Sequence, residues 1–276
     1  MMSPNQFLIW IALMLFAQVT RGQSAYLNSP SAMGKGGTGV STFDSWASLS
    51  NPAGTSKHSQ TGASASYYLP YFINELSAKN ALILLPFKWG VLSTHFQQFG
   101  NSSYQENSIG IAYSKSLTPK LHAAFQFNIQ NNRLSQSGSG HQFFSNMGLI
   151  YEASEHIRVG VAIVNPEQST ITIQDNTTAL PSLFVLGFNW GPSSNFDISC
   201  ELEKQDDYKS LFKLGFQYEI IETVWLRTGV FGKPWNYTLG LGLHIFDFQL
   251  DIGMTNHNIL GLSSCIGITY LLKQKP

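Results

Sequence analysis

The sequence predicts an all-β protein: a transmembrane antiparallel up-and-down β-barrel of about 14 strands, with a short N-terminal plug in its lumen. The prediction rests on alternating residue types, on the lengths of the connections, and on composition. Charged residues make up 12% of the chain, about half the usual share for a soluble domain, and aromatic residues make up 13%. This composition suits an outer wall in contact with hydrocarbon. The net charge of zero favours neither nucleic acid nor an anionic surface.

The segment 237–245 shows the alternation clearly. Its odd-numbered positions read Tyr, Leu, Leu, Leu, Ile, and its even-numbered positions read Thr, Gly, Gly, His. A period of two predicts a strand. A soluble sandwich would place charged residues on its outer face, whereas here the second face is small and polar, as expected for the lining of a lumen.

Residues 1–22 are predicted to be a signal peptide. The apolar run at 7–17 is long enough for the core of such a peptide and too short to span a bilayer. Cleavage is expected after Gly22, and the alternative is a buried first helix. A secreted chain without a longer apolar run is either soluble or spans a membrane as a closed barrel, because lipid tolerates no unpaired strand edge.

Alternation bounded by turn residues predicts the barrel over residues 61–276. The expected strands are 61–70, 76–86, 90–98, 106–116, 120–130, 142–153, 156–165, 182–191, 195–204, 208–219, 222–232, 235–245, 247–255 and 259–272. Each has the length that a tilted transmembrane strand requires.

The connections between these strands are alternately short and long, which is typical of an outer-membrane barrel. The long connections at 131–141 and 166–181 are expected outside the cell. These features predict a barrel in the outer membrane of a Gram-negative bacterium. With the short turns in the periplasm, an even number of strands places both termini there too. Aromatic residues near the strand ends are expected to form an interfacial girdle; they are Trp89, Trp190, Trp225, Trp235, Tyr218 and Tyr270.

The segment 23–60 does not alternate and is the predicted plug. Its motif residues are Met33, Gly34, Gly36, Gly37, Gly39, Asn51, Pro52 and Gly54. The glycines could suggest a phosphate-binding loop, but no GK[ST] sequence follows them. Flexible backbone that packs in a confined space explains them better.

Residues 31–54 resemble the opening of the FadL-like outer-membrane proteins, a group that includes the PorV/PorQ branch associated with type IX secretion. The family pattern runs approximately "SARAMGMGGAGVA…A…NPAGL" after the signal peptide, and later blocks at 147–166, 180–187 and 226–251 also agree with it. The resemblance covers nearly all of the mature chain and implies a barrel of fourteen strands with residues 32–54 in the lumen. Two departures are the much shorter chain than in fatty-acid transporters and the ending Lys-Gln-Lys-Pro in place of a terminal aromatic residue.

Charged residues expected to face the lumen cluster late in the chain: Asp197, Glu201, Glu203, Lys213, Arg227 and Asp251. Opposite charges on adjacent strands can pair across the ladder. We expect a salt-bridge network that holds the plug, with a polar gate or ligand contact as the alternative. No catalytic residue, metal site or cofactor is predicted, because no arrangement of Ser, His and Asp stands out. Cys200 and Cys265 are expected on different faces of their strands, without metal-ligand spacing.

Two functions follow from these observations. The favoured one is a structural or accessory barrel, similar to PorV and PorQ, in a protein export or assembly complex. The alternative is a FadL-like transporter for passive uptake of small hydrophobic compounds, and an enzyme is the least favoured. The expected partners are outer-membrane lipid and proteins of such a complex, with a hydrophobic small molecule for the alternative.

Overall fold

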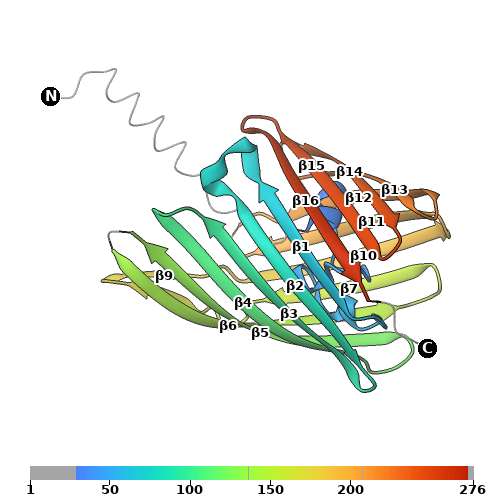
Figure 1. Cartoon of the computed structure of the whole chain (residues 1–276), viewed down its shortest axis with the longest axis horizontal. Coiled ribbons are helices and arrows are strands. Elements are labelled where there is room, and N and C mark those ends of the chain that lie inside the picture. Colours follow the sequence, from blue (N-terminus) through green and yellow to red (C-terminus); the bar gives the residue numbers. More distant parts are fainter. Residues whose placement is uncertain (1–28, 136, 207, 273–276) are drawn as a thin grey trace.

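The computed structural model of the protein describes residues 29–272 except 136 and 207, and within them fourteen strands form a closed antiparallel barrel (Figure 1). The predicted fold class is thereby confirmed, and the predicted signal peptide lies outside the described residues. In this part of the chain, no helix is long and apolar enough to cross a membrane.

The barrel strands follow the predicted ones closely. They are β1 (Gly62–Leu69), β2 (Ala78–Phe87), β3 (Gly90–Gly100), β4 (Tyr104–Ser116), β5 (Leu121–Leu134), β6 (Gly138–Glu152), β7 (Ile157–Val164), β10 (Leu183–Ser193), β11 (Phe196–Gln205), β12 (Leu211–Ile221), β13 (Val224–Phe231), β14 (Asn236–Ile245), β15 (Phe248–His257) and β16 (Gly261–Leu271). Each pairs with the next one along the barrel, and the pairing of β1 with β16 closes it.

Side chains alternate between the two faces of the wall. On β4, Ile109 and Ile111 are exposed on the outer face, while Gly110 and Ala112, which alternate with them, are buried on the lumen side. The same alternation of exposed apolar and buried small or polar residues recurs around the barrel. The wall therefore presents an apolar outer belt of the kind that contacts hydrocarbon.

Most of the expected girdle residues lie on the outside, where Trp89, Trp190 and Tyr218 are exposed. Trp225 is the exception, and its assignment to the girdle was wrong. It shares the lumen face of β13 with buried Arg227, and its indole N–H donates to Glu219 at 3.2 Å. The ring faces the lumen because Trp225 lies on the same side of β13 as Arg227, and because Glu219 accepts its N–H there.

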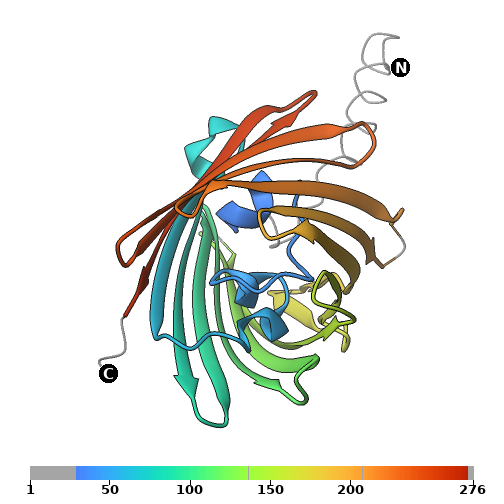
Figure 2. The ribbon, with the colours of Figure 1, turned by 90° about the vertical axis from the view of Figure 1, so that its right-hand side faces the viewer.

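The described part of the segment that precedes the strands, from residue 29 onward, lies inside the barrel (Figure 2). It forms the short helix α2 (Pro30–Gly34) and the 3-10 helices η2 (Ala47–Leu49) and η3 (Pro52–Thr55). The Ser29 and Asn51 side chains cap α2 and η3, and each of these helices begins with a proline. Proline is suited to a first helical position, because its missing N–H would have no helical partner there. We call the described part of this segment, residues 29–60, the plug.

The two long connections differ from the expectation. The connection expected at 131–141 consists largely of strand, because β5 runs to Leu134 and β6 begins at Gly138. The connection at 166–181 contains a separate hairpin of β8 (Thr170–Ile173) and β9 (Asn176–Ala179). Between β1 and β2 lie two single-turn helices, η4 (Pro70–Phe72) and η5 (Asn74–Leu76). We call the end that carries these connections the long-loop end, and the opposite end the short-turn end.

The outer belt predicts a strong asymmetry between the faces of β4. Ile109→Arg, near the middle of the strand on the outer face, should lower the free energy of unfolding in lipid vesicles by about 2–4 kcal/mol, because a cation is then placed in hydrocarbon. Ser108→Arg is the matched control, because its side chain points into the polar lumen and is partly exposed there. Urea titration in vesicles measures both, and equal costs would contradict the assignment of the faces.

Candidate functional site

The candidate site is the interface between the plug and the lumen wall. Eight wall glycines lie so close to the plug that a β-carbon added at any of them would come within 2.7 Å of a plug atom. They are Gly148, Gly160, Gly187, Gly215, Gly229, Gly240, Gly253 and Gly267. The plug therefore lies directly on the backbone of the wall along β6, β7, β10 and β12–β16.

The predicted motif residues occupy distinct places in this interface. Met33 is fully buried in an apolar cluster with Tyr68, Ala78 and Cys265. Gly34 abuts Gly240 of β14. The other motif residues follow along the plug: Gly36, Gly37, Gly39, Asn51, Pro52 and Gly54.

Gly36 shows why one of these positions requires glycine. Its φ of 67° lies in the left-handed region, and an added β-carbon would lie 2.6 Å from the Leu214 carbonyl oxygen. Its N–H donates to the Thr238 hydroxyl at 2.8 Å. Any side chain here would strain the backbone and push the plug away from β12.

Glu201 binds the backbone of the plug. One of its carboxylate oxygens accepts hydrogen bonds from the N–H groups of Gly39 and Val40, at 2.6 and 2.7 Å. Two residues further along β11, Glu203 pairs with Lys213 of β12 at 2.7 Å, and Lys213 also donates to the Gly37 carbonyl oxygen. These buried charges therefore hold the turn of the plug at residues 37–40.

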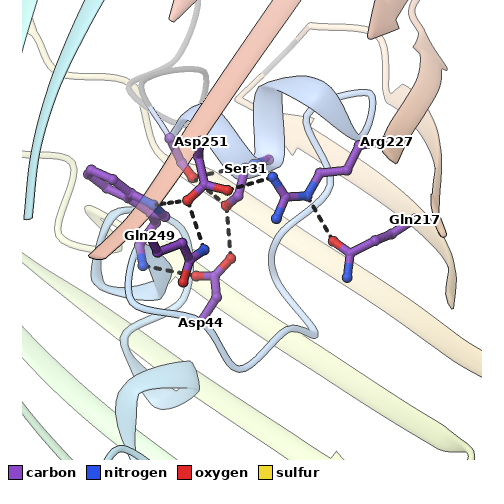
Figure 3. A network of polar contacts seen from close by, with 9 residues as sticks. Ser31, Asp44, Gln217, Arg227, Gln249 and Asp251 are labelled. Atoms are coloured by element: carbon purple, nitrogen blue, oxygen red, sulfur yellow. Dashed lines mark hydrogen bonds and ion pairs between the residues drawn. The ribbon is translucent and has the colours of Figure 1, made fainter. Parts of the chain in front are cut away.

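A second network holds the other side of the plug (Figure 3). Arg227 of β13 pairs with Asp251 of β15 at 2.6 Å, and Arg227 also donates to Gln217 at 2.8 Å. The second carboxylate oxygen of Asp251 accepts from the indole N–H of Trp46 in the plug at 3.1 Å and from Gln249 at 2.8 Å. The barrel ion pair thus binds the plug through a tryptophan.

The predicted charge cluster is therefore divided. Glu201, Glu203 and Lys213 form one group, and Arg227 with Asp251 forms another. Asp197 belongs to neither: it pairs with Arg158 at 3.1 Å, and the two side chains remain 29% and 27% exposed. Alternation predicts the face of the strand correctly for all six residues but does not predict their depth in the lumen.

Asn51 makes contacts that the sequence did not indicate. Its side-chain N–H groups donate to the Val40 carbonyl oxygen at 2.7 Å and to the wall carbonyls of Leu149 and Val161 at 3.1 and 3.3 Å. This position is possible because the neighbouring wall residue is Gly148, where a β-carbon would collide with the Asn51 amide oxygen. Asn51 thus joins two parts of the plug to the β6–β7 ladder.

Lys35 is a further buried charge that sequence reasoning missed, because it lies outside the alternating segments. Burial lowers the pKa of its ammonium below the usual range, and the charge of Asp44 opposes this effect. Ser31 donates a hydrogen bond to Asp44 at 2.9 Å. The plug therefore carries a carboxylate whose charge acts on its own buried cation.

At the short-turn end, the plug is held by Glu152. This carboxylate pairs with Lys57 at 2.5 Å and with His122 at 2.8 Å, and Lys57 also lies over the ring of Phe43. Thr55 and Ser114 share a hydrogen bond of 2.8 Å nearby. Within the described ranges, no group of three His, Cys, Asp or Glu side chains could hold a metal, and Cys200 and Cys265 form no disulfide. The contacts of Glu152 with Lys57 and His122, and of Thr55 with Ser114, together form a polar clamp on the plug at the short-turn end.

A pocket of about 200 Å³ lies at the long-loop end, between the β8–β9 hairpin and the wall. Its apolar lining comes from Leu134, Ile171 and Ile173, and Tyr104 and Asn132 supply polar groups. The hairpin that the sequence did not predict forms one side of it. Its volume is below the roughly 300–1,000 Å³ of sites for drug-sized ligands, so it has room only for a small molecule.

The hydrogen bonds of Glu201 predict that this one carboxylate protects specific plug amides. Glu201→Gln should raise the hydrogen-exchange rates of the Gly39 and Val40 amides roughly ten- to a hundredfold, because hydrogen bonds to a charged group contribute about 1.5–3 kcal/mol. Glu222→Gln in the exposed β12–β13 turn is the control and should change neither amide. Equally faster exchange throughout the barrel strands would indicate general destabilisation and contradict a local effect of Glu201.

Comparison with known proteins identifies the fold. No family model and no curated protein matches the sequence. Among solved structures, the toluene transporter TodX of Pseudomonas putida superposes with a TM-score of 0.62 at 10% identity, covering 87% of this chain and 95% of that one. The monoaromatic hydrocarbon channel CymD gives 0.68 at 12% identity, with coverage of 92% and 100%. A FadL homologue of Pseudomonas aeruginosa gives 0.64 at 10% identity, with coverage of 91% and 98%. The chain therefore has the fold of the FadL-type fourteen-stranded outer-membrane barrels.

Proposed function

We propose that the protein is an outer-membrane channel for passive uptake of small hydrophobic compounds, and that the plug is its gate. The fold is shared over most of the chain with a toluene transporter and a monoaromatic hydrocarbon channel. This similarity supports the transport alternative better than the accessory role that the sequence favours.

The polar character of the plug–wall interface carries the proposal. The plug is held by Glu201, Asp251 and Asn51 through hydrogen bonds, and water can replace such bonds when a plug moves. A plug held only by a large apolar core would lose much more on exposure to an aqueous lumen. Polar contacts with glycine surfaces are therefore suited to a segment that rearranges.

The pocket at the long-loop end supports the same function. It offers apolar side chains to a small compound before that compound reaches the plug. Its lining comes from the long-loop ends of β4 and β5 and from the β8–β9 hairpin, so it lies beside the lumen mouth. A compound bound there would be concentrated at the entrance.

An accessory role, similar to that of PorV and PorQ, is the second candidate. It is favoured by apolar side chains on neighbouring connections at the long-loop end, where Phe72 is 56% and Ile259 is 73% exposed. Tyr71 and His257, next to them, stack edge to face. Exposed apolar residues at a rim are suited to a protein partner.

The gating proposal predicts that fixing the plug stops passage. In a background with Cys200 and Cys265 replaced by Ala, Thr55→Cys with Ser114→Cys should form a disulfide between the plug and β4, because the native hydroxyls are 2.8 Å apart. Oxidation should reduce uptake of radiolabelled toluene by expressing cells to background, and a reductant should restore it.

The matched control is a disulfide within the wall. Ser64→Cys with Thr269→Cys joins β1 to β16, where the native hydroxyls are also 2.8 Å apart, and should leave uptake unchanged. Equal uptake with the plug locked or free would contradict gating by this segment. Absence of uptake in every form, with a protein partner retained on purification, would favour the accessory role.

The orientation proposed for the barrel places both termini in the periplasm and the long-loop end outside the cell. An epitope tag inserted after Asp175, at the tip of the β8–β9 hairpin, should bind antibody on intact cells. A tag after Thr118, in the turn between β4 and β5, should bind only after permeabilisation. The reverse result would invert the topology.

A further inference from the structure

The outer wall of the barrel has a notch on its lipid-facing side. This notch is a cavity of about 300 Å³ over β5, β6 and β7, lined by apolar side chains. The lining residues include Ala123, Phe125, Met147, Leu149, Val161 and Ile163. Its volume is at the lower end of the range of ligand sites, roughly 300–1,000 Å³.

Small residues create the notch. Ala123 stands opposite Leu149 in the β5–β6 ladder, and the next pair is Ala124 with Gly148. A methyl group at Ala123, between the larger side chains of Leu121 and Phe125 on the same face, leaves the wall backbone as the floor of the cavity. The notch is therefore a local depression in an otherwise filled apolar surface.

The floor of the notch is closed from inside. Behind it, Asn51 of the plug donates to the carbonyl oxygens of Leu149 and Val161. Gly148 is in direct contact with the plug. A molecule in the notch therefore enters from the membrane and not from the lumen, whatever the state of the channel.

The notch lies just inside the headgroup region at the short-turn end. Tyr113 and Tyr151 are exposed on the outer face near this end of β4 and β6, as in an aromatic belt. Lys115, two residues beyond Tyr113, stands directly opposite Ala123 in the β4–β5 ladder. A cationic side chain thus lies beside an apolar cavity, at the depth of the boundary between the phosphate groups and the acyl chains of a phospholipid.

The charges around this end favour an anion at this position. Lys115 and Lys120 are exposed, and neither makes an ion pair among the described residues. The nearby carboxylate of Glu152 is occupied by Lys57 and His122. One exposed carboxylate, Glu155 in the β6–β7 turn, lies at the same end, so the two lysines outnumber it there. Away from these strands, Glu222 and Asp247 lie in the β12–β13 and β14–β15 turns.

We propose that this notch binds one acyl chain of an anionic glycerophospholipid, with its phosphate on Lys115 and Lys120. The apolar floor receives the chain, and the two ammonium groups bind the headgroup as point charges. A second copy of the barrel would bring only an apolar wall to the notch and would leave both lysines without a counter-charge. The site holds the lipid beside the ladder that carries the plug, and it is independent of the compound that the channel conducts.

Native mass spectrometry of the detergent-solubilised full chain tests the proposal, with phosphatidylglycerol and phosphatidylethanolamine of identical chains as probes. The wild type should retain one phosphatidylglycerol in preference to phosphatidylethanolamine. Ala123→Leu fills the notch and should weaken this binding about tenfold, which corresponds to excluding about two methylene groups from an apolar site. Lys115→Gln with Lys120→Gln should remove the preference between the two lipids.

The controls are Ala81→Leu, on the lipid-facing side of β2, and Lys209→Gln, in the connection between β11 and β12 at the other end; neither should alter binding. Unchanged binding in Ala123→Leu would overturn the proposal, as would equal effects of the controls. A preference for lipid A over phosphatidylglycerol would also overturn it. So would a dimer in the wild type that Ala123→Leu dissociates, because a second copy would then be the occupant.

Discussion

A closed sheet takes the segment that it encloses out of bulk water, so the backbone groups of the plug must find partners inside the lumen. The short helices of the plug satisfy only part of this requirement. The rest is met by the wall: Glu201 accepts two plug N–H groups, Thr238 accepts another, and Lys213 donates to a plug carbonyl. These bonds require the two backbones to come very close. The wall glycines make this approach possible, and most other features of the lumen follow from it.

The buried charges are arranged so that each has a partner. A charge buried without a partner is costly, and even a paired one often contributes little net stability. Arg227 and Asp251 are paired across β14, where small Gly242 leaves room for the guanidinium. The value of such pairs here is geometric, because they hold Trp46 and the turn at residues 37–40 in fixed positions. The same bonds can exchange with water, which an apolar core cannot do without a large loss.

The sequence predicted the wall better than the plug contacts. Strands such as β14 and β16 were predicted because one face meets lipid and the other meets the lumen, which imposes a strict period of two. The region 131–141 was predicted as a connection because it is polar on both faces. In the structure the β5–β6 ladder continues through much of this region. A strand with water on both sides keeps its backbone hydrogen bonds, but its sequence no longer alternates between apolar and polar residues.

The same period of two placed the lumen charges on the correct face of their strands. Their depth in the lumen separates Asp197 from the other five. This depth depends on the tilt and stagger of the strands in the whole barrel, which the sequence of one strand does not determine. The bond from Asn51 to the wall depends on a distant glycine, so no local signal could indicate it.

The seam between β1 and β16 has a consequence for the order of assembly. β1 is the first strand after the plug and β16 is the last strand of the chain, so this pairing joins the two most distant parts of the barrel. Such a contact forms late, because it closes the longest possible loop. Until then, the sheet is an open, curved surface whose inner face carries Glu201, Asp251 and the glycines. The plug directly precedes β1 in the chain and can settle on this surface before the edges meet. Its contacts with β6, β7 and β10–β15 would then help to curve the sheet, so the enclosed segment serves as a template for the wall that encloses it.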